Sequence, residues 1–244
     1  MTKISNKVFP ELPSFSIVIP TYNEEDNIDW LVRDMVKNSP RLGINDMEIL
    51  IIDDGSTDKT GKISDELSKE FKSVRVIHKS NGGYCSALLR GIKEAKKDHV
   101  AYFPADGQTL MEDIVSCLPL LGKVDLILGD RGKRLDYTPY RLFISHIYLI
   151  LLKILFNNPY HDINWFHIWK RERIQNLVTV STGIFILAEI VIRFRRKGFS
   201  IAEASVPYRS RRSGDVKNAK LSIAWKTFTD MVRFWILTKT QSAY

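Results

Sequence analysis

The sequence predicts an α/β fold with a mostly parallel sheet flanked by helices, and three observations support this prediction. Short apolar runs alternate with segments in which apolar residues recur at helical spacing, which is typical of strand–helix–strand units. The stretch MEILIIDDGSTD, residues 47–58, begins with an apolar run that suits a central strand covered on both faces and ends in a polar loop. Polar clusters follow three of the predicted strands, as expected where a ligand binds at the carboxyl ends of an open α/β sheet.

The first half of the chain supplies the repeating units. Residues 1–14 are polar with two prolines and are expected to form an extended lead-in. The predicted strands cover residues 15–19, the apolar start of 47–58, and residues 74–77, 99–103 and 124–128. The predicted helices carry apolar residues on one face and cover residues 28–36, 63–71, 84–95 and 111–121. Gly82 and Gly83 lack the spacing of a dinucleotide or Walker loop, so we expect them to form a helix-entry turn.

The second half begins with a very apolar segment, RLFISHIYLILLKILFN, residues 141–157. Its apolar run of about 15 residues falls short of the roughly 20 that a membrane-crossing helix needs. Basic residues within and beside it favour an amphipathic helix at a membrane interface. A buried core helix or a dimer helix remains the alternative.

The remaining elements are expected to be strands at 163–169 and 199–206 and helices at 182–197 and 221–237. No internal repeat or long linker interrupts the chain. We therefore predict one domain, residues 1–220, followed by a C-terminal amphipathic helix, residues 221–244.

Composition and charge restrict the function. The chain has 244 residues, 44% hydrophobic and 26% charged, as in an ordinary folded protein. Residues 1–130 hold 16 Lys and Arg against 21 Asp and Glu, whereas residues 131–244 hold 20 against 7. A basic second half suits an anionic membrane or a phosphorylated substrate. Nucleic acid is not expected, because the chain has no helix-turn-helix or aromatic RNA-binding pattern.

Several common site types have no support in the sequence. Cys85 and Cys117 lack metal-ligand spacing and are expected to be buried thiols. The five histidines make no HxxxH pattern, and no Ser-His-Asp or Cys-His set is evident. No amino-terminal segment has the features of a secretion signal, so the chain is expected in the cytoplasm.

The polar clusters carry the functional signal. On its own, Asp53-Asp54-Gly-Ser could be only a turn and a helix cap. However, the chain holds SIVIPTYNEEDNI, EILIIDDGSTD, PADGQ, LGDR and EIVIRFRRKGFSIAEASVPYRSRRSGDVK, in this order, between Ser16 and Lys217. In these motifs it resembles the nucleotide-sugar-dependent glycosyltransferases of family 2, which have the GT-A fold. Within them it is similar to the dolichyl- and polyprenyl-phosphate sugar synthases, such as dolichol-phosphate mannose synthase.

The resemblance implies roles for individual residues. The implied catalytic residues are Asp106, Gln108 and Arg131, of which Asp106 and Gln108 would bind Mg²⁺ or Mn²⁺. The implied nucleotide-binding residues are Pro20, Tyr22, Glu24, Ile51, Asp53, Asp54, Ala105 and Asp106. Arg131, Arg211 and Lys217 would bind phosphate, and Asp162 and Glu189 would face the acceptor pocket. For Glu189, an ion pair with Arg193 would look the same in the sequence.

Two positions depart from the family pattern. Many members carry Asp two residues before Asp106, where this chain has Pro104, so we expect weaker metal binding. After Asp162, members usually have a small residue, whereas this chain has the bulky, shorter stretch Asn164-Trp165-Phe166-His167. The identity of the transferred sugar therefore stays open. The sequence also leaves open the base of the donor nucleotide, uracil or guanine, and the oligomeric state.

The resemblance implies transfer of a hexose from a UDP- or GDP-sugar to a polyprenyl or dolichyl phosphate, with inversion at the anomeric carbon. The enzyme would associate peripherally with the cytoplasmic face of a membrane. A phosphate monoester has a second pKa near 6, so such an acceptor needs no strong general base. The alternatives are a soluble or cell-surface saccharide acceptor, a nucleotidyltransferase, and a non-catalytic nucleotide-binding relative.

Overall fold

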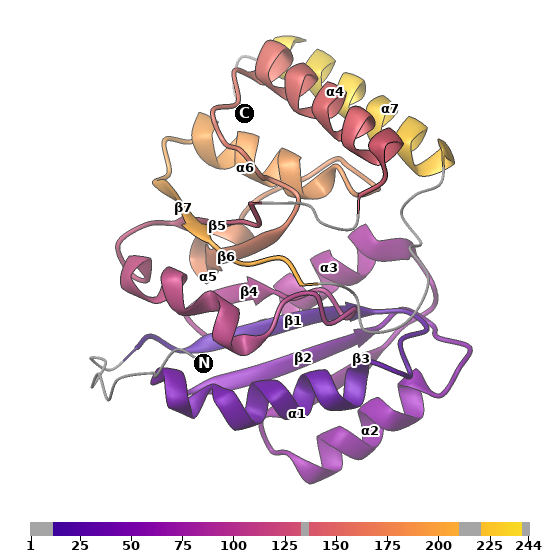
Figure 1. Ribbon diagram of the computed structural model, residues 1–244, viewed down its shortest axis with the longest axis vertical. Coiled ribbons are helices and arrows are strands. Elements are labelled where there is room, and N and C mark those ends of the chain that lie inside the picture. Colours follow the sequence, from indigo (N-terminus) through magenta and orange to yellow (C-terminus); the bar gives the residue numbers. More distant parts are fainter. Residues whose placement is uncertain (1–11, 133–136, 210–220, 241–244) are drawn as a thin grey trace.

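A seven-stranded sheet forms the centre of the computed structural model, which describes residues 12–132, 137–209 and 221–240 (Figure 1). The strands are β1 (Phe15–Thr21), β2 (Met47–Asp53), β3 (Val74–His78), β4 (His99–Tyr102), β5 (Leu126–Asp130), β6 (Phe166–Lys170) and β7 (Ile201–Ser205). They lie in the order β3-β2-β1-β4-β6-β5-β7. Only β6 runs antiparallel to its neighbours, β4 and β5, so the prediction of a mostly parallel sheet is confirmed.

Helices cover both faces of the sheet. The helices are α1 (Ile28–Asn38), η1 (Pro40–Leu42), α2 (Thr60–Glu70), α3 (Gly83–Glu94), η2 (Met111–Leu120), α4 (Pro139–Phe156), α5 (Arg171–Gln175), α6 (Ile186–Arg196) and α7 (Leu221–Thr240). Buried side chains of α1, α2 and η2 share one core, and those of α3 to α7 share the other. In Figure 1, α1 and α2 lie at one end of the molecule, and α4 and α7 lie at the other.

The central strands explain why two cores form. In β1, Ile17 and Ile19 are buried in the core beneath α1, and Val18 is buried in the core beneath α3. In β2, Ile51 and Ile52 alternate in the same way. Because successive side chains of a strand point to opposite faces, an unbroken apolar run fills both cores.

Three predicted elements differ in detail from the observed ones. The expected helix at 111–121 is a 3₁₀ helix that contains Pro119, which has no N–H to donate. The strand expected from residue 163 begins at Phe166, and the preceding Ile163 carbonyl accepts a hydrogen bond from the His167 ring (3.0 Å). The helix expected from residue 182 begins at Ile186. The helices η1 and α5 were not expected.

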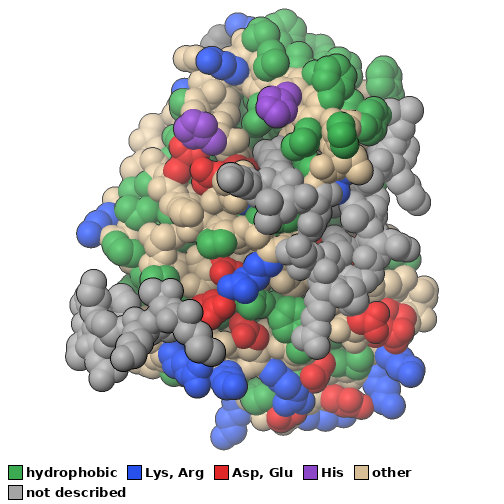
Figure 2. Space-filling model, in the orientation of Figure 1, with side chains coloured by type: hydrophobic (Ala, Val, Ile, Leu, Met, Phe, Trp, Pro, Cys, Tyr) green, Lys and Arg blue, Asp and Glu red, His purple; other side chains and the backbone are tan. Residues whose placement is uncertain are grey.

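Helix α4 lies on the surface. It has 18 residues and, by length and composition, is the one helix in the described part of the chain that is long and apolar enough to cross a membrane. Only 6% of it is buried inside the protein, so the alternative of a buried core helix is wrong. Five large apolar side chains of α4 are exposed at helical spacing: Tyr140, Phe143, Ile147, Ile150 and Ile154. Figure 2 shows hydrophobic side chains gathered over this end of the molecule.

Helix α7 packs on the domain next to α4 (Figure 1). Phe234 is almost fully buried, and its ring stacks on Phe156 of α4 and tilts against Phe185 at centroid distances of 5.6 and 5.9 Å. The expected domain boundary at residue 220 lies outside the described residues and stays a prediction. The two cysteines are free and buried, as expected.

Candidate active site

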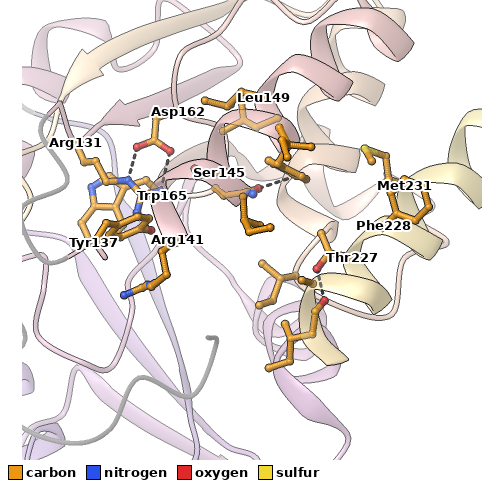
Figure 3. Close-up of a pocket in the computed structure, with 18 of the residues that line it drawn as sticks. Arg131, Tyr137, Arg141, Ser145, Leu149, Asp162, Trp165, Thr227, Phe228 and Met231 are labelled. Carbon is orange, nitrogen blue, oxygen red and sulfur yellow. Dashed lines mark hydrogen bonds and ion pairs between the residues drawn. The ribbon is translucent and has the colours of Figure 1, made fainter. Parts of the chain in front are cut away.

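One cavity of about 800 Å³ lies between the carboxyl ends of the central strands and the helices α4 and α7 (Figure 3). Its two ends differ in character. The polar end is lined by Asp106, Gln108, Arg131, Asp162 and Tyr208. The apolar end is lined by Ile144, Ile147 and Leu151 of α4 and by Ile223, Phe228 and Met231 of α7. The cavity can therefore hold a molecule with a charged head and an apolar tail.

The loop after β4 brings two predicted site residues to the polar end. Gly107 has a φ of 71°, and a Cβ at this position would lie 2.4 Å from the Trp30 ring, so the turn requires glycine. The Oδ1 atom of Asp106 accepts a hydrogen bond from the backbone N–H of Gln108 (3.1 Å). Ala105 is buried beside them. The sheet thus presents Asp106 and Gln108 together, as the sequence predicted.

The oxygen atoms at this loop fit a cation that is coordinated partly by the protein and partly by the phosphates of a substrate. Among the described residues, no group of three or more His, Cys, Asp or Glu could hold a metal ion. Pro104 lines the cavity and offers no side-chain ligand. Mg²⁺ is commonly held by one or two carboxylates together with substrate phosphates and water. Asp106 with the Gln108 amide oxygen fits that arrangement, whereas a closed protein cage is not available here.

Arg131 and Asp162 form a nearly buried ion pair beside this loop. The Nε and Nη2 atoms of Arg131 donate to the Asp162 carboxylate, with 2.8 Å between Nη2 and Oδ1. Nη1 donates to the Tyr137 hydroxyl (3.1 Å), and the guanidinium lies 4.8 Å from the Trp165 ring centroid. Burial disfavours the charged guanidinium, but the pair with Asp162 more than compensates and raises the pKa of Arg131. Arg131 therefore stays cationic.

The residues expected to bind the nucleotide lie at the ends of β1 and β2. Tyr22 is 38% exposed and Pro20 is half-buried. The carboxylate of Glu24 accepts a hydrogen bond from Asn27 Nδ2 (2.8 Å), which orients it at the start of α1. Ile51 is fully buried in the core, so the expected contact with a nucleotide is wrong for its side chain.

Asp53 is held by its own loop and by His78. Its Oδ1 accepts from the Ser56 N–H (3.0 Å), and its Oδ2 lies 2.9 Å from His78 Nδ1. The other ring nitrogen of His78 lies 3.0 Å from Asp65 Oδ1. Burial opposes ionisation of Asp53, but hydrogen bonds from Ser56 and His78 outweigh it and lower the pKa of Asp53. Hydrogen bonds to Asp65 and Asp53 raise the pKa of His78.

Replacing His78 by Gln is expected to destabilise the protein in a pH-dependent way. The pKa of folded His78 lies above its ordinary value of 6.5, so its stabilising effect is complete below that value and is lost as the pH rises through the raised pKa. The effect should stay below about 1 kcal/mol, because the side chain is half-exposed. Chemical denaturation of both proteins below and well above pH 6.5 measures it. An equal difference at both pH values would contradict this account.

Asp54 stabilises the start of α3. Its carboxylate accepts from the N–H groups of Gly82 (3.0 Å) and Gly83 (2.7 Å), and Lys79 pairs with it. Its side chain therefore caps the start of α3, where negative charge is favoured. The expected helix-entry turn at Gly82 and Gly83 is confirmed, whereas the expected nucleotide contact of Asp54 has no support in this geometry.

Glu189 does not face the cavity, which corrects the expected acceptor-pocket role. Its carboxylate is fully buried and accepts from the N–H groups of Val180 (2.9 Å) and Ser181 (2.8 Å) and from Arg193 Nε (2.7 Å). The pair with Arg193 that the sequence allowed is present, although it is buried rather than on the surface. Asp230 accepts a hydrogen bond from the Gly183 N–H (3.0 Å). The carboxylates of Glu189 and Asp230 thus fix the loop before α6.

The Glu189→Ala variant is expected to lose about 3–5 kcal/mol of unfolding free energy, because it removes the buried carboxylate that pairs with the nearly buried Arg193. Urea denaturation measures this loss. The matched control is Glu172→Ala, whose exposed ion pairs should contribute less than about 1 kcal/mol. A loss no larger than that of the control would contradict the buried role.

The residues that line the cavity are not the same set as the predicted site residues. Arg211 and Lys217 lie outside the described residues, so their phosphate-binding role stays a prediction. Other residues line the cavity without having been assigned a role from the sequence, among them Arg141, Ser145 and Tyr208. Arg141 was visible only as the first residue of an apolar segment, and Tyr208 only as part of a loop. Figure 3 shows Arg141 and Ser145 on the α4 side of the cavity.

Solved structures confirm the GT-A fold. The glucosyl-3-phosphoglycerate synthase of Mycobacterium tuberculosis, in complex with Mn²⁺, UDP and glucosyl-3-phosphoglycerate, superposes with a TM-score of 0.66. The match covers 91% of this chain and 79% of that chain, at 18% identity. The same enzyme in complex with Mg²⁺ and UDP gives the same TM-score.

Curated relatives are similar over different lengths. A dolichol-phosphate mannosyltransferase of Pyrococcus furiosus is 29% identical over 83% of this chain, and a polyprenol monophosphomannose synthase of Mycolicibacterium smegmatis is 27% identical over 81%. These matches span 58% and 78% of the relatives' own lengths. An uncharacterized glycosyltransferase of Bacillus subtilis, EpsJ, is 33% identical over 39% of this chain and 26% of its own length. The model of the glycosyl transferase family 2 matches residues 16–195, and the chain belongs to this family.

Proposed function

We propose that this protein transfers a hexose from a UDP- or GDP-sugar to a polyprenyl phosphate. The observation that carries the proposal is the two-sided cavity, whose polar end is lined by Asp106 and Gln108 of the loop after β4 and whose apolar end lies between α4 and α7. A lipid monophosphate has the same division into a charged head and a hydrocarbon tail. The names of the Pyrococcus and Mycolicibacterium relatives also support this acceptor.

Two arginines at the polar end suit the acceptor phosphate. Arg131 is held cationic by Asp162, and Arg141 of α4 lies 4.1 Å from the Tyr137 ring centroid. Among the described residues, no carboxylate forms an ion pair with Arg141, so none of them neutralises its charge. Guanidinium groups can bind phosphate oxygens with two parallel hydrogen bonds. Arg141 would therefore provide the positive charge that the Arg131–Asp162 pair itself lacks.

The apolar end distinguishes a lipid from a sugar acceptor. Its lining by Ile147, Leu151, Phe228 and Met231 offers hydrocarbon contacts to an isoprenoid chain. A saccharide would instead leave its hydroxyl groups without hydrogen-bond partners at this end, which is costly. The geometry therefore favours the lipid over the saccharide acceptor.

The proposed reaction is a single displacement. An oxygen of the acceptor phosphate forms a bond to the anomeric carbon while the bond from that carbon to the donor diphosphate breaks, and the electron pair leaves with the nucleoside diphosphate. The acceptor is already dianionic near pH 7, so the site needs no strong general base. Asp106 and Gln108 would hold Mg²⁺ or Mn²⁺, which stabilises the negative charge on the departing diphosphate.

The transfer assay uses the purified protein, a panel of UDP- and GDP-sugars, Mg²⁺ or Mn²⁺, and a short polyprenyl phosphate. Mass spectrometry should detect one lipid-phosphate-sugar and the matching nucleoside diphosphate. Parallel reactions contain saccharides or small phosphorylated acids as acceptors. Transfer to one of these acceptors and none to the lipid would overturn the proposal. Release of pyrophosphate would indicate a nucleotidyltransferase instead.

We further propose that the exposed faces of α4 and α7 attach the protein to the cytoplasmic face of a membrane. The exposed apolar residues of α4 are joined by Trp225, Phe228 and Ile236 of α7. Exposed Lys153 and Arg233 lie on the same two helices. An apolar face bordered by basic side chains binds at the boundary between lipid headgroups and acyl chains, most strongly when the lipids are anionic.

Replacing Phe143 and Ile154 together by Asp is expected to weaken binding to anionic phospholipid vesicles at least about tenfold, since each buried side chain contributes roughly 1.5–3 kcal/mol. The two side chains are 62% and 72% exposed, so the fold should be retained. Vesicle sedimentation measures the change. The control is Val115→Asp on η2, a 41% exposed apolar position away from α4 and α7. Equal sedimentation of the double variant and the control would contradict this surface.

A further inference from the structure

Tyr208 contacts both Gln108, in the loop after β4, and Trp165, which packs on the guanidinium of the Arg131–Asp162 ion pair. The hydroxyl of Tyr208 accepts a hydrogen bond from Gln108 Nε2 (2.7 Å), and the carbonyl oxygen of Arg209 accepts a second one from the same nitrogen (3.3 Å). A backbone carbonyl can only accept, so the Gln108 amide must turn its NH₂ group toward this segment. The amide oxygen is then directed away from Tyr208 and Arg209, and it is the side-chain atom that remains to bind a cation.

The segment that holds the amide is itself fixed. The ring of Tyr208 packs against Trp165 at a centroid distance of 5.4 Å, and Trp165 donates its indole N–H to the Val206 carbonyl (3.3 Å). Arg209 donates from Nε to Asp113 (2.8 Å) and from Nη2 to Glu112 (2.7 Å). These contacts hold the hydroxyl of Tyr208 and the carbonyl of Arg209 beside the Gln108 amide.

We propose that Tyr208 is a positioning residue for the divalent cation, because its hydroxyl, with the weaker contact to the Arg209 carbonyl, fixes the Gln108 amide with its oxygen available as a ligand. The inference rests on the proposed use of a cation at Asp106 and Gln108. Partners that orient a metal ligand typically account for 10–100-fold in metal affinity. Tyr208 would thus contribute to cation binding without contacting the cation.

The test is a titration of the full protein with Mn²⁺ in the presence of saturating UDP or GDP, whichever the protein binds, followed by electron paramagnetic resonance of free Mn²⁺. The Tyr208→Phe variant loses only one oxygen atom and should keep its fold. We expect its Mn²⁺ affinity to fall about tenfold or more, while UDP binding without metal is unchanged. Tyr160→Phe, which alters a tyrosine outside the cavity lining, should bind Mn²⁺ as the parent protein does.

A second comparison shows whether Tyr208 acts through Gln108. In a Gln108→Ala background, Tyr208→Phe should cause no further loss, because the amide that it orients is absent. Additive losses, or an unchanged affinity of Tyr208→Phe alone, would overturn the inference while leaving the proposed function intact. If the parent protein binds no Mn²⁺ with either UDP or GDP, the cation of the proposed function and this inference both fail.

Discussion

The Asp106→Asn variant is expected to lose sugar transfer by about 10³-fold, since a metal ion contributes several kcal/mol of transition-state stabilisation and each 1.36 kcal/mol is tenfold in rate. Asp106 is the one carboxylate that the loop after β4 brings to the cavity beside Gln108. The neutral amide keeps the size of the side chain but binds a hard cation much more weakly. Steady-state transfer rates at saturating donor measure the loss.

Two controls separate this effect from misfolding and from a general loss of charge. Asp46→Asn alters a carboxylate that is exposed and pairs with Lys97 on the surface, and it should transfer sugar at the normal rate. Thermal unfolding of Asp106→Asn should match that of the parent protein. Activity within tenfold of the parent, at equal stability, would show that Asp106 is not the metal-binding carboxylate.

The Arg131→Met variant is expected to lose about 3–5 kcal/mol of unfolding free energy as well as its activity. It removes the guanidinium that pairs with the Asp162 carboxylate, whose side chain is only 4% exposed. Removing one member of a buried ion pair has this cost because the other charge stays in a poorly solvated place. Urea denaturation and the transfer assay measure the two losses.

The double variant Arg131→Met with Asp162→Asn distinguishes the structural role of the pair from its catalytic role. With both charges removed, most of the lost stability should return, because no unpaired charge is buried. Transfer should remain undetectable, because the acceptor phosphate still lacks the Arg131 guanidinium. Recovery of activity together with stability would mean that the pair serves only to hold the cavity wall.

The sequence predicted the parts of the fold that depend on local pattern. The parallel strands β1 to β4 and the helices between them follow from apolar spacing, and the turn at Gly82 follows from glycine content. The family motifs placed Asp106, Gln108, Arg131 and Asp162 in one site, and the structure brings these four side chains to the same cavity. Their roles in catalysis and binding stay predictions.

Contacts between distant segments could not be predicted in this way. Glu189 appeared to be a functional carboxylate because its sequence position does not reveal Val180 and Ser181 folding over it. The antiparallel direction of β6 depends on its pairing with both β4 and β5, which no local pattern encodes. The role of Tyr208 depends on a hydrogen bond to a residue 100 positions earlier in the chain.

Photo-crosslinking tests whether the cavity lined by the strand ends, α4 and α7 holds a lipid phosphate. A polyprenyl phosphate with a diazirine on its isoprenoid chain is irradiated with the protein in the presence of UDP and Mg²⁺, and the labelled peptides are identified by mass spectrometry. We expect labels on residues 144–151 and 223–231 that unlabelled polyprenyl phosphate prevents and a simple alkyl detergent does not. Labels distributed over the outer surface, or labels on these helices that the detergent removes equally well, would contradict the account.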